Sequence, residues 1–142
     1  MKQLSVFVEN KVGRLSAVLN VLKENDVDIS ALSLADTSEY GILRLVVDKP
    51  DEAVAALKNE GVMVKCTQVI AAAMDDAPGG LAHLLELLSE ANVGIEYMYA
   101  FIGKAEGKAW TVLRVDDIDI ATEVFKKNGV AMHDDHDNYR HG

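Results

Sequence analysis

The sequence contains two copies of one pattern in tandem, and this duplication limits the folds that the chain can adopt. Gly13 is followed by apolar residues at helical spacing, and the same arrangement recurs 66 residues later, from Gly79. Beyond a longer turn in the second copy the shift becomes 68, so that Gly61 corresponds to Gly129. Between these points the matched pairs include Leu15 and Leu81, Val18 and Leu84, Leu19 and Leu85, Leu22 and Leu88, and Ile29 and Ile95. Because glycines and helix-face residues keep their register together, we interpret the pattern as an internal repeat.

Each copy predicts the order strand, helix, strand, strand, helix, strand. In the first copy, polarity alternates over residues 4–8 as in a strand, and apolar residues recur over 15–22 as in a helix. Further strands are predicted over 29–35, 42–47 and 62–65, and a second helix between Pro50 and Gly61. The predicted fold class is therefore α+β, with each copy a ferredoxin-like βαββαβ unit whose antiparallel sheet carries two helices on one face.

Composition narrows the function. The chain has 14 basic and 23 acidic residues, a net charge of −9, which disfavours nucleic acid as a partner. Its single cysteine, Cys66, allows no internal disulfide and fits a reducing compartment. No apolar run is long enough to span a membrane, and the first residues are too few and too polar for a signal peptide. We therefore expect a cytoplasmic protein without a membrane partner.

The usual catalytic and metal patterns are missing from the sequence. It contains no Gly-x-Ser-x-Gly elbow, no phosphate-binding loop and no Cys-x-x-Cys pair, so we expect neither an enzyme nor a cofactor. His133, Asp134, Asp135, His136, Asp137 and His141 are ligand-type residues, but they lie in a polar tail without fixed spacing, and we predict no metal site. Tyr97, Tyr99 and Phe101 share one face of a predicted strand and are interpreted as packing residues.

The two glycine turns that lead from a strand into a helix are the best candidates for a binding site. The N–H groups of Gly13, Arg14, Gly79, Gly80 and Leu81, with the positive end of the helix dipole, suit the carboxylate of an amino acid. Asn10 and Asp76 stand at matched positions and offer acceptors for its ammonium group. Alternatively, glycine serves only a tight connection, and Arg14 is a solvated cation.

These residues resemble the ACT domain family. The resemblance lies in Asp76-Ala77-Pro78-Gly79-Gly80-Leu81 with its leucine-rich helix, in Asn92-Val93-Gly94-Ile95, and in the similar first copy around Gly13. It implies a tandem pair, residues 1–67 and 68–136, followed by a polar tail, 137–142. It also implies that the repeats pair through their second strands into one eight-stranded sheet with all helices on one face. Some tandem proteins of this kind are named acetolactate synthase regulatory-like.

The resemblance further implies where a ligand sits, namely beside the first turn of one repeat and against the second strand of the other. One cleft would comprise Asn10, Val12, Gly13, Arg14 and Leu15 with Gly94, Ile95 and Glu96, and the other Asp76, Pro78, Gly79, Gly80 and Leu81 with Asp28, Ile29 and Ser30. The first copy departs from the motif, because Val12 replaces the proline and Arg14 the second glycine. We expect Arg14 to bind a carboxylate and Glu96 an ammonium, which makes this cleft the better site for an amino acid.

Three functions remain open at this stage. The leading one is a non-catalytic regulatory module that binds an amino acid and acts as a homodimer or on an enzyme of amino-acid metabolism. The second is a structural or protein-interaction domain without a ligand, and the third, weaker one is an enzyme on a ferredoxin-like scaffold. The protein contact is expected on the helix-free face of the sheet, to which Phe7, Leu43 and Val47 are expected to contribute apolar surface.

Overall fold

The computed structural model describes residues 1–36, 39–102 and 107–133. The chain divides into two compact units, Lys2–Thr67 and Gln68 onward with Met1, here named repeat one and repeat two. Repeat one comprises β1 (Lys2–Glu9), α1 (Arg14–Glu24), β2 (Ile29–Asp36), β3 (Tyr40–Val47), α2 (Pro50–Asn59) and β4 (Val64–Gln68). Repeat two comprises β5 (Ile70–Asp75), α3 (Gly80–Glu90), β6 (Ile95–Ala100), β7 (Lys108–Val115) and α4 (Ile118–Lys127).

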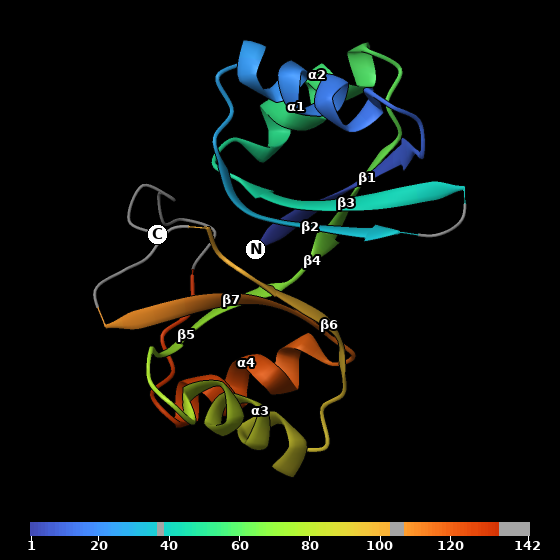
Figure 1. Cartoon of the computed structure of the whole chain (residues 1–142). Helices are drawn as coiled ribbons and strands as arrows, with labels where there is room; N and C mark the ends of the chain where they lie inside the picture. Colours follow the sequence, from blue (N-terminus) through green and yellow to red (C-terminus); the bar gives the residue numbers. More distant parts are fainter. Residues whose placement is uncertain (37–38, 103–106, 134–142) are drawn as a thin grey trace. The chain divides into compact units, whose positions relative to one another are not determined.

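Both repeats have the predicted ferredoxin-like topology. The strand order is β2-β3-β1-β4 in repeat one and β5-β7-β6 in repeat two. In repeat two, Met132 forms an isolated antiparallel bridge with Ala72, so the chain beside β5 takes the place that β4 takes beside β1. Figure 1 shows that the two helices of each repeat cover one face of its sheet. The duplicated α+β fold predicted from the sequence is therefore confirmed.

Within each repeat the described strands form one antiparallel sheet, of four strands in repeat one and three in repeat two, and the pairing of the repeats into one eight-stranded sheet stays a prediction. The two strands expected to pair across the repeats, β2 and β6, share an irregularity. The pairing register shifts between Ile29 and Ala31 in β2 and between Ile95 and Tyr97 in β6. A bulge bends its strand and locally interrupts the regular row of edge hydrogen-bonding groups.

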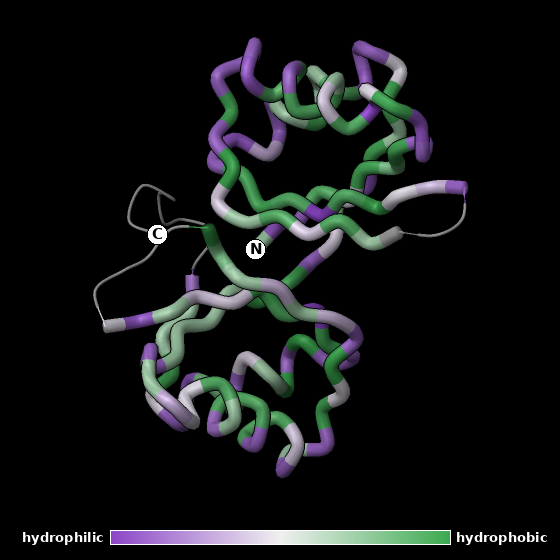
Figure 2. Tube along the Cα trace, in the orientation of Figure 1, coloured by the Kyte–Doolittle hydropathy of each residue, from purple (hydrophilic) through white to green (hydrophobic). Residues whose placement is uncertain are grey.

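Each repeat has its own hydrophobic core between its sheet and its helices. Val18 and Leu22 of α1 and Leu84 and Leu88 of α3 are the buried residues of these helices, as the helical spacing predicts. Figure 2 shows hydrophobic residues along the strands and a mixture of hydrophilic and hydrophobic residues along the helices. The core of repeat one contains Leu4, Val6, Val8, Val18, Leu22, Val27, Leu43, Leu45, Val47, Ala53 and Leu57. That of repeat two contains Ile70, Ala72, Leu84, Leu88, Val93, Leu113, Val115, Ala121 and Phe125.

One expectation about the helix-free face is wrong. Leu43 and Val47 were expected to add apolar surface there, but both are buried in the core on the helix side of the sheet. The reason is the register of β3, in which Leu43 pairs with Val6 and Leu45 with Leu4, so that the odd-numbered residues of β3 face the helices.

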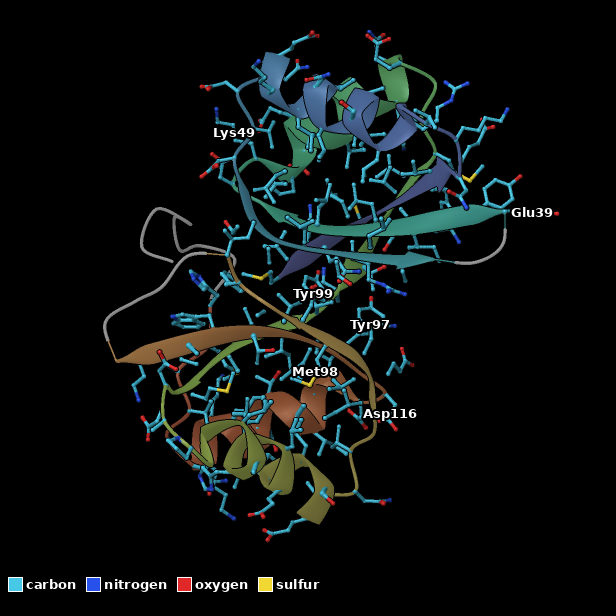
Figure 3. All side chains as sticks on the ribbon, in the orientation of Figure 1. Glu39, Lys49, Tyr97, Met98, Tyr99 and Asp116 are labelled. Carbon is cyan, nitrogen blue, oxygen red and sulfur yellow. The ribbon has the colours of Figure 1, made fainter. Side chains whose placement is uncertain are left out.

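The alternation of β6 follows the prediction. In Figure 3, Met98 points toward α3 and α4, and Tyr97 and Tyr99 point to the other face of the sheet. The two tyrosine rings stack with their centroids 6.4 Å apart, and the ring centroids of Phe101 and Trp110 lie 6.2 Å apart. These aromatic side chains therefore pack against one another, as we interpreted them.

Candidate functional site

The two glycine turns have almost identical backbone conformations. Gly13 has φ 86° and ψ −9°, and Gly79 has φ 87° and ψ −8°, both in the left-handed region. Glycine adopts this conformation without the steric cost that a side chain adds. The two residues precede α1 and α3 directly, so the turns place two helix N-termini at matched positions.

Part of the expected hydrogen-bonding capacity of the turns is already used. The Arg14 N–H donates to the Lys11 carbonyl oxygen at 3.2 Å, and the Gly80 N–H donates to that of Ala77 at 3.1 Å. These two N–H groups were expected to be open to a carboxylate, and the structure corrects that expectation because each closes its own turn. The backbone N–H of Asn10 is also used within the repeat, because it donates to the Glu39 carbonyl oxygen at 3.2 Å.

The helices that follow the glycine turns begin without a negative partner. Neither α1 nor α3 has a side-chain cap or an acidic residue in its first turn. The other two helices do: α4 is capped by Asp117, whose side chain accepts from the Ile120 N–H at 3.1 Å, and α2 carries Asp51 and Glu52 in its first turn. A carboxylate is favourable at a helix N-terminus, so α1 and α3 keep this electrostatic preference unsatisfied within their own first turns.

A steric constraint explains why the second residue of Gly79-Gly80 is a glycine. A Cβ atom at Gly80 would overlap the carbonyl oxygen of Asp75, whereas nothing lies within 4 Å of a Cβ at Gly79. The matched residue in repeat one is Arg14, which carries a full side chain. The chain therefore approaches the helix start more closely in repeat two, and the turn of repeat one leaves room for the arginine.

The candidate residues of the second strands take part in a hydrogen-bonded clip within their own repeat. The Asp28 N–H donates to Asp48 Oδ1 at 2.9 Å, and the Gly94 N–H donates to Asp116 Oδ1 at 3.0 Å. The same aspartates return backbone hydrogen bonds to Asp28 and Gly94. Asp116 lies beside the start of β6 in Figure 3. These contacts fix the entry into β2 and β6, a structural role that sequence reasoning missed.

Three further candidates of the second strands pack or pair locally. Ile29 and Ile95 contact the cores of their own repeats, and Ser30 lies at the bulge of β2. Glu96 was expected to receive an ammonium group, but it already forms an ion pair with Arg114 at 3.3 Å. An added ammonium at Glu96 would have to compete with this guanidinium.

Within one repeat, the glycine turn and the start of the second strand lie at opposite ends of the sheet. Glu9, just before the turn, pairs with Tyr40 at the start of β3, whereas Ile29 pairs with Val47 at the end of β3. A single repeat therefore does not bring the two halves of an expected cleft together. Their pairing across repeats stays a prediction.

The structure shows a cavity beside each glycine turn that sequence reasoning did not predict. In repeat one, a cavity of about 690 Å³ is lined by residues of β1, α1 and the start of β3 and by the segment between α2 and β4. Its lining residues are Phe7, Val8, Glu9, Arg14, Ala17, Val18, Val21, Tyr40, Glu60, Gly61, Val62 and Met63. In repeat two, a cavity of about 570 Å³ is lined by Ala73, Met74, Asp75, Ala77, Pro78, Gly79, Gly80, His83, Leu84, Lys108, Asn128, Gly129, Val130 and Ala131.

The two cavities occupy matched positions. Every lining residue in repeat one except Val21 has its repeat counterpart in the lining of the other cavity. Arg14, Pro78, Gly79 and Gly80 are the predicted site residues found in these linings, whereas the exposed Val12 and the helix residues Leu15 and Leu81 are not. The internal repeat could have indicated that the two turns have equivalent surroundings. The segments after α2 and α4, however, come to lie beside these turns only in the tertiary structure.

Charge distinguishes the cavity of repeat two. Lys108 Nζ lies 2.7 Å from Asp75 Oδ1. The hydrogen bond and charge of Lys108 lower the pKa of Asp75 below its ordinary value of 3.8, and the charge of His83 adds a smaller effect in the same direction. This cavity therefore has a solvent-exposed ion pair in its lining, beside the glycine turn.

We expect Lys108→Met to return the pKa of Asp75 to about its ordinary value, which NMR titration of the side-chain carboxyl carbon can measure. Because the pKa of Asp75 is lowered in the folded state, the ion pair stabilises the fold above the unfolded-state pKa and loses this effect as pH falls through the folded-state pKa. The loss of this stabilisation is therefore expected at pH values below 3.8. An unchanged titration in the variant would contradict the assigned cause, and Lys126→Met, at a lysine outside this cavity, is the control.

Candidate metal ligands do not cluster in the described part of the chain, where no group of three or more His, Cys, Asp or Glu side chains could hold an ion. Of the predicted histidine- and aspartate-rich segment, only His133 lies within the described residues; the rest of it and the tail 137–142 lie outside them. None of the described helices is long and apolar enough to cross a membrane.

The fold and the paired glycine turns define a class of protein: a tandem pair of ferredoxin-like repeats, each with a helix N-terminus presented by a left-handed glycine. The sequence matches the family described as ACT domain pair over residues 1–140, and the chain belongs to this family. No curated protein matches the chain significantly.

Among solved structures, protein BT0572 from Bacteroides thetaiotaomicron is 40% identical, with a TM-score of 0.91, and the match covers 98% of this chain and 95% of that one. The ligand-free regulatory subunit of aspartate kinase from Thermus thermophilus is 13% identical, with a TM-score of 0.67 and coverage of 89% and 91%. The corresponding subunit from Thermus flavus is 15% identical, with a TM-score of 0.60 and coverage of 89% and 90%. The latter two show that the fold is shared.

Proposed function

We propose that this ACT domain pair, residues 1–67 and 68–136, is a non-catalytic regulatory module that binds an amino acid at its glycine turns. The observation that carries the proposal is the contrast between helix starts. The two helices that begin at Gly13 and Gly79 lack both a cap and an acidic first turn, whereas α2 and α4 have acidic groups there. A ligand carboxylate satisfies the preference that α1 and α3 leave open.

The ligand-binding residues that we propose are those of the two turns, with the second strands of the opposite repeat as the other walls. Asn10, Val12, Gly13, Arg14 and Leu15 would act with Gly94, Ile95 and Glu96, and Asp76, Pro78, Gly79, Gly80 and Leu81 with Asp28, Ile29 and Ser30. The left-handed glycines, the uncapped helix starts and the adjacent cavities support the turn residues. The N–H groups of Asp28 and Gly94 already donate to aspartates of their own repeats. The second strands would therefore offer a ligand mainly contact surface and few hydrogen bonds.

The module would act in the cytoplasm through protein contacts, either as a homodimer or on an enzyme of amino-acid metabolism. Membership of the ACT domain pair family supports a regulatory role. Two proteins of the same fold carry the name regulatory subunit of aspartate kinase, and this name motivates the class of partner.

A thermal-shift screen of the twenty amino acids against the full chain tests the proposal. A ligand at about 100 times its dissociation constant adds about 2.7 kcal/mol to the stability of the folded state, which is an easily measured rise in melting temperature. We expect at least one amino acid to give a saturable rise and the others to give none. If no amino acid shifts the transition at millimolar concentration, the amino-acid proposal is wrong and the structural or protein-interaction reading takes its place.

A further inference from the structure

The cavity of repeat one differs from its counterpart in the residues around its mouth. Met63 is 65% exposed and Tyr40 is 51% exposed, although both side chains are large and mainly apolar. Their repeat counterparts are Ala131 and Lys108, one small and one charged. Exposed apolar side chains gathered at a concave site indicate binding of an apolar group, and methionine adapts its shape to such a group. Repeat one has this character and repeat two does not.

The interior of this cavity is apolar along one face of α1. Arg14, Ala17, Val18 and Val21 follow the i, i+3, i+4, i+7 spacing of a single helix face, and all four line the cavity. From Arg14 to Val21 the helix rises by about 10 Å, at about 1.5 Å per residue. The cavity therefore runs from a cationic end beside the glycine turn to an apolar end at Val21, with Val8 and Val62 also in its lining.

The cavity lining contains one cation and one anion that could each meet one charge of a zwitterion. Among the described residues, Arg14 and Glu60 form no ion pair, whereas Glu9, the other carboxylate of the lining, lies 3.2 Å from Lys11 Nζ. Arg14 begins α1 and Glu60 follows α2, so the free cation and the free anion come from two different walls of the cavity. In repeat two the matched residues, Gly80 and Asn128, carry no charge.

We propose that the cavity inside repeat one binds an α-amino acid with a large apolar side chain, its carboxylate on Arg14 and its ammonium on Glu60. This inference rests on the proposed function and specifies the ligand class and the cavity. The apolar side chain extends along α1 past Ala17 and Val18 toward Val21, in a cavity whose lining also includes Tyr40 and Met63. A small side chain would leave Val21 and Met63 without contact, so the cavity selects for size as well as polarity. Repeat two, which has Gly80 and Asn128 in place of Arg14 and Glu60, does not take this ligand.

Calorimetric titration of the full chain with leucine, phenylalanine, alanine and aspartate tests the class of ligand. We expect leucine or phenylalanine to bind and alanine and aspartate to bind at least about tenfold more weakly, because they lose the apolar contacts. Isopentylamine, which is leucine without its carboxylate, and 4-methylpentanoate, which is leucine without its ammonium, should each bind about ten- to hundredfold more weakly than leucine.

Variants of the chain test the cavity. Arg14→Gln and Glu60→Gln should each weaken binding about ten- to hundredfold, because each removes one charged partner. Ala17→Leu should abolish binding by filling the cavity from an exposed helix position. Ala55→Leu makes the same change at an exposed position of α2 outside the lining, and His83→Ala changes the counterpart of Ala17 in repeat two. Both controls should bind like the unchanged chain.

The outcomes separate this inference from the proposed function. If an amino acid binds but Arg14→Gln and Ala17→Leu bind it as tightly as the unchanged chain, the cavity of repeat one is not its site and only this inference fails. The same holds if the amino acid that binds is small or charged. If no amino acid binds at all, the proposed function fails and this inference fails with it.

Discussion

Phe125→Ala is expected to destabilise the protein by about 3–5 kcal/mol, the largest effect of any single change considered. Phe125 is fully buried and is the largest such side chain, and it belongs to the core of repeat two. Its removal takes the apolar ring out of that core and leaves a cavity that the surrounding side chains only partly fill. Urea denaturation followed by tryptophan fluorescence measures the loss, because the single tryptophan, Trp110, lies in β7 of the same repeat.

The matched control for this change lies on the same helix. Ile120 is 45% exposed, so Ile120→Ala removes apolar atoms that are already partly in water and should cost well under half as much. Similar losses for the two variants would contradict the assignment of Phe125 to the core and of Ile120 to the surface.

Gly80→Ala is expected to destabilise the fold by about 1–3 kcal/mol, the second largest effect. An added Cβ would overlap the Asp75 carbonyl oxygen, which is a backbone atom at the end of β5 and cannot rotate away as a side chain could. To relieve the overlap, the turn between β5 and α3 would have to move. The midpoint of thermal unfolding, measured by far-ultraviolet circular dichroism, should fall.

Repeat one provides the comparison for Gly80→Ala. Arg14 occupies the matched position and already carries a Cβ, so Arg14→Ala should change stability by only about 0.5 kcal/mol. If Gly80→Ala were as mild as Arg14→Ala, the close approach in repeat two would not be the reason for its second glycine. The same measurement tests whether the fold stays intact without the Arg14 side chain, as the binding experiments require.

The main difference between the two repeats lies in the charged and polar residues that line their matched cavities. The positions of Arg14 and Glu60 in repeat one correspond to those of Gly80 and Asn128 in repeat two. Repeat two instead holds Asp75 and Lys108 in an ion pair. Substitutions in the lining therefore give two matched cavities of the same fold a different charge and polarity.

The sequence by itself determined the repeated architecture. The matched glycines and leucines predict two ferredoxin-like units, and local physical causes explain why this prediction holds. The left-handed conformation of Gly13 and Gly79 favours glycine, and helical spacing places Val18 and Leu22 in the core. Asp26 and Asn92, at the ends of the first helix of each repeat, share a positive φ, of 56° and 59°, so the repeat extends to the backbone conformation.

Tertiary structure alone decided the irregularities of the second strands and the composition of the cavity linings. The strand bulges at Ile29 and Ile95 and the clips formed by Asp48 and Asp116 depend on hydrogen bonds between residues about twenty positions apart, which no local pattern reveals. The cavity linings likewise combine the turn before α1 with the segment after α2. Sequence spacing specifies which face of an element is apolar, whereas the distance between two elements is fixed only when their cores pack.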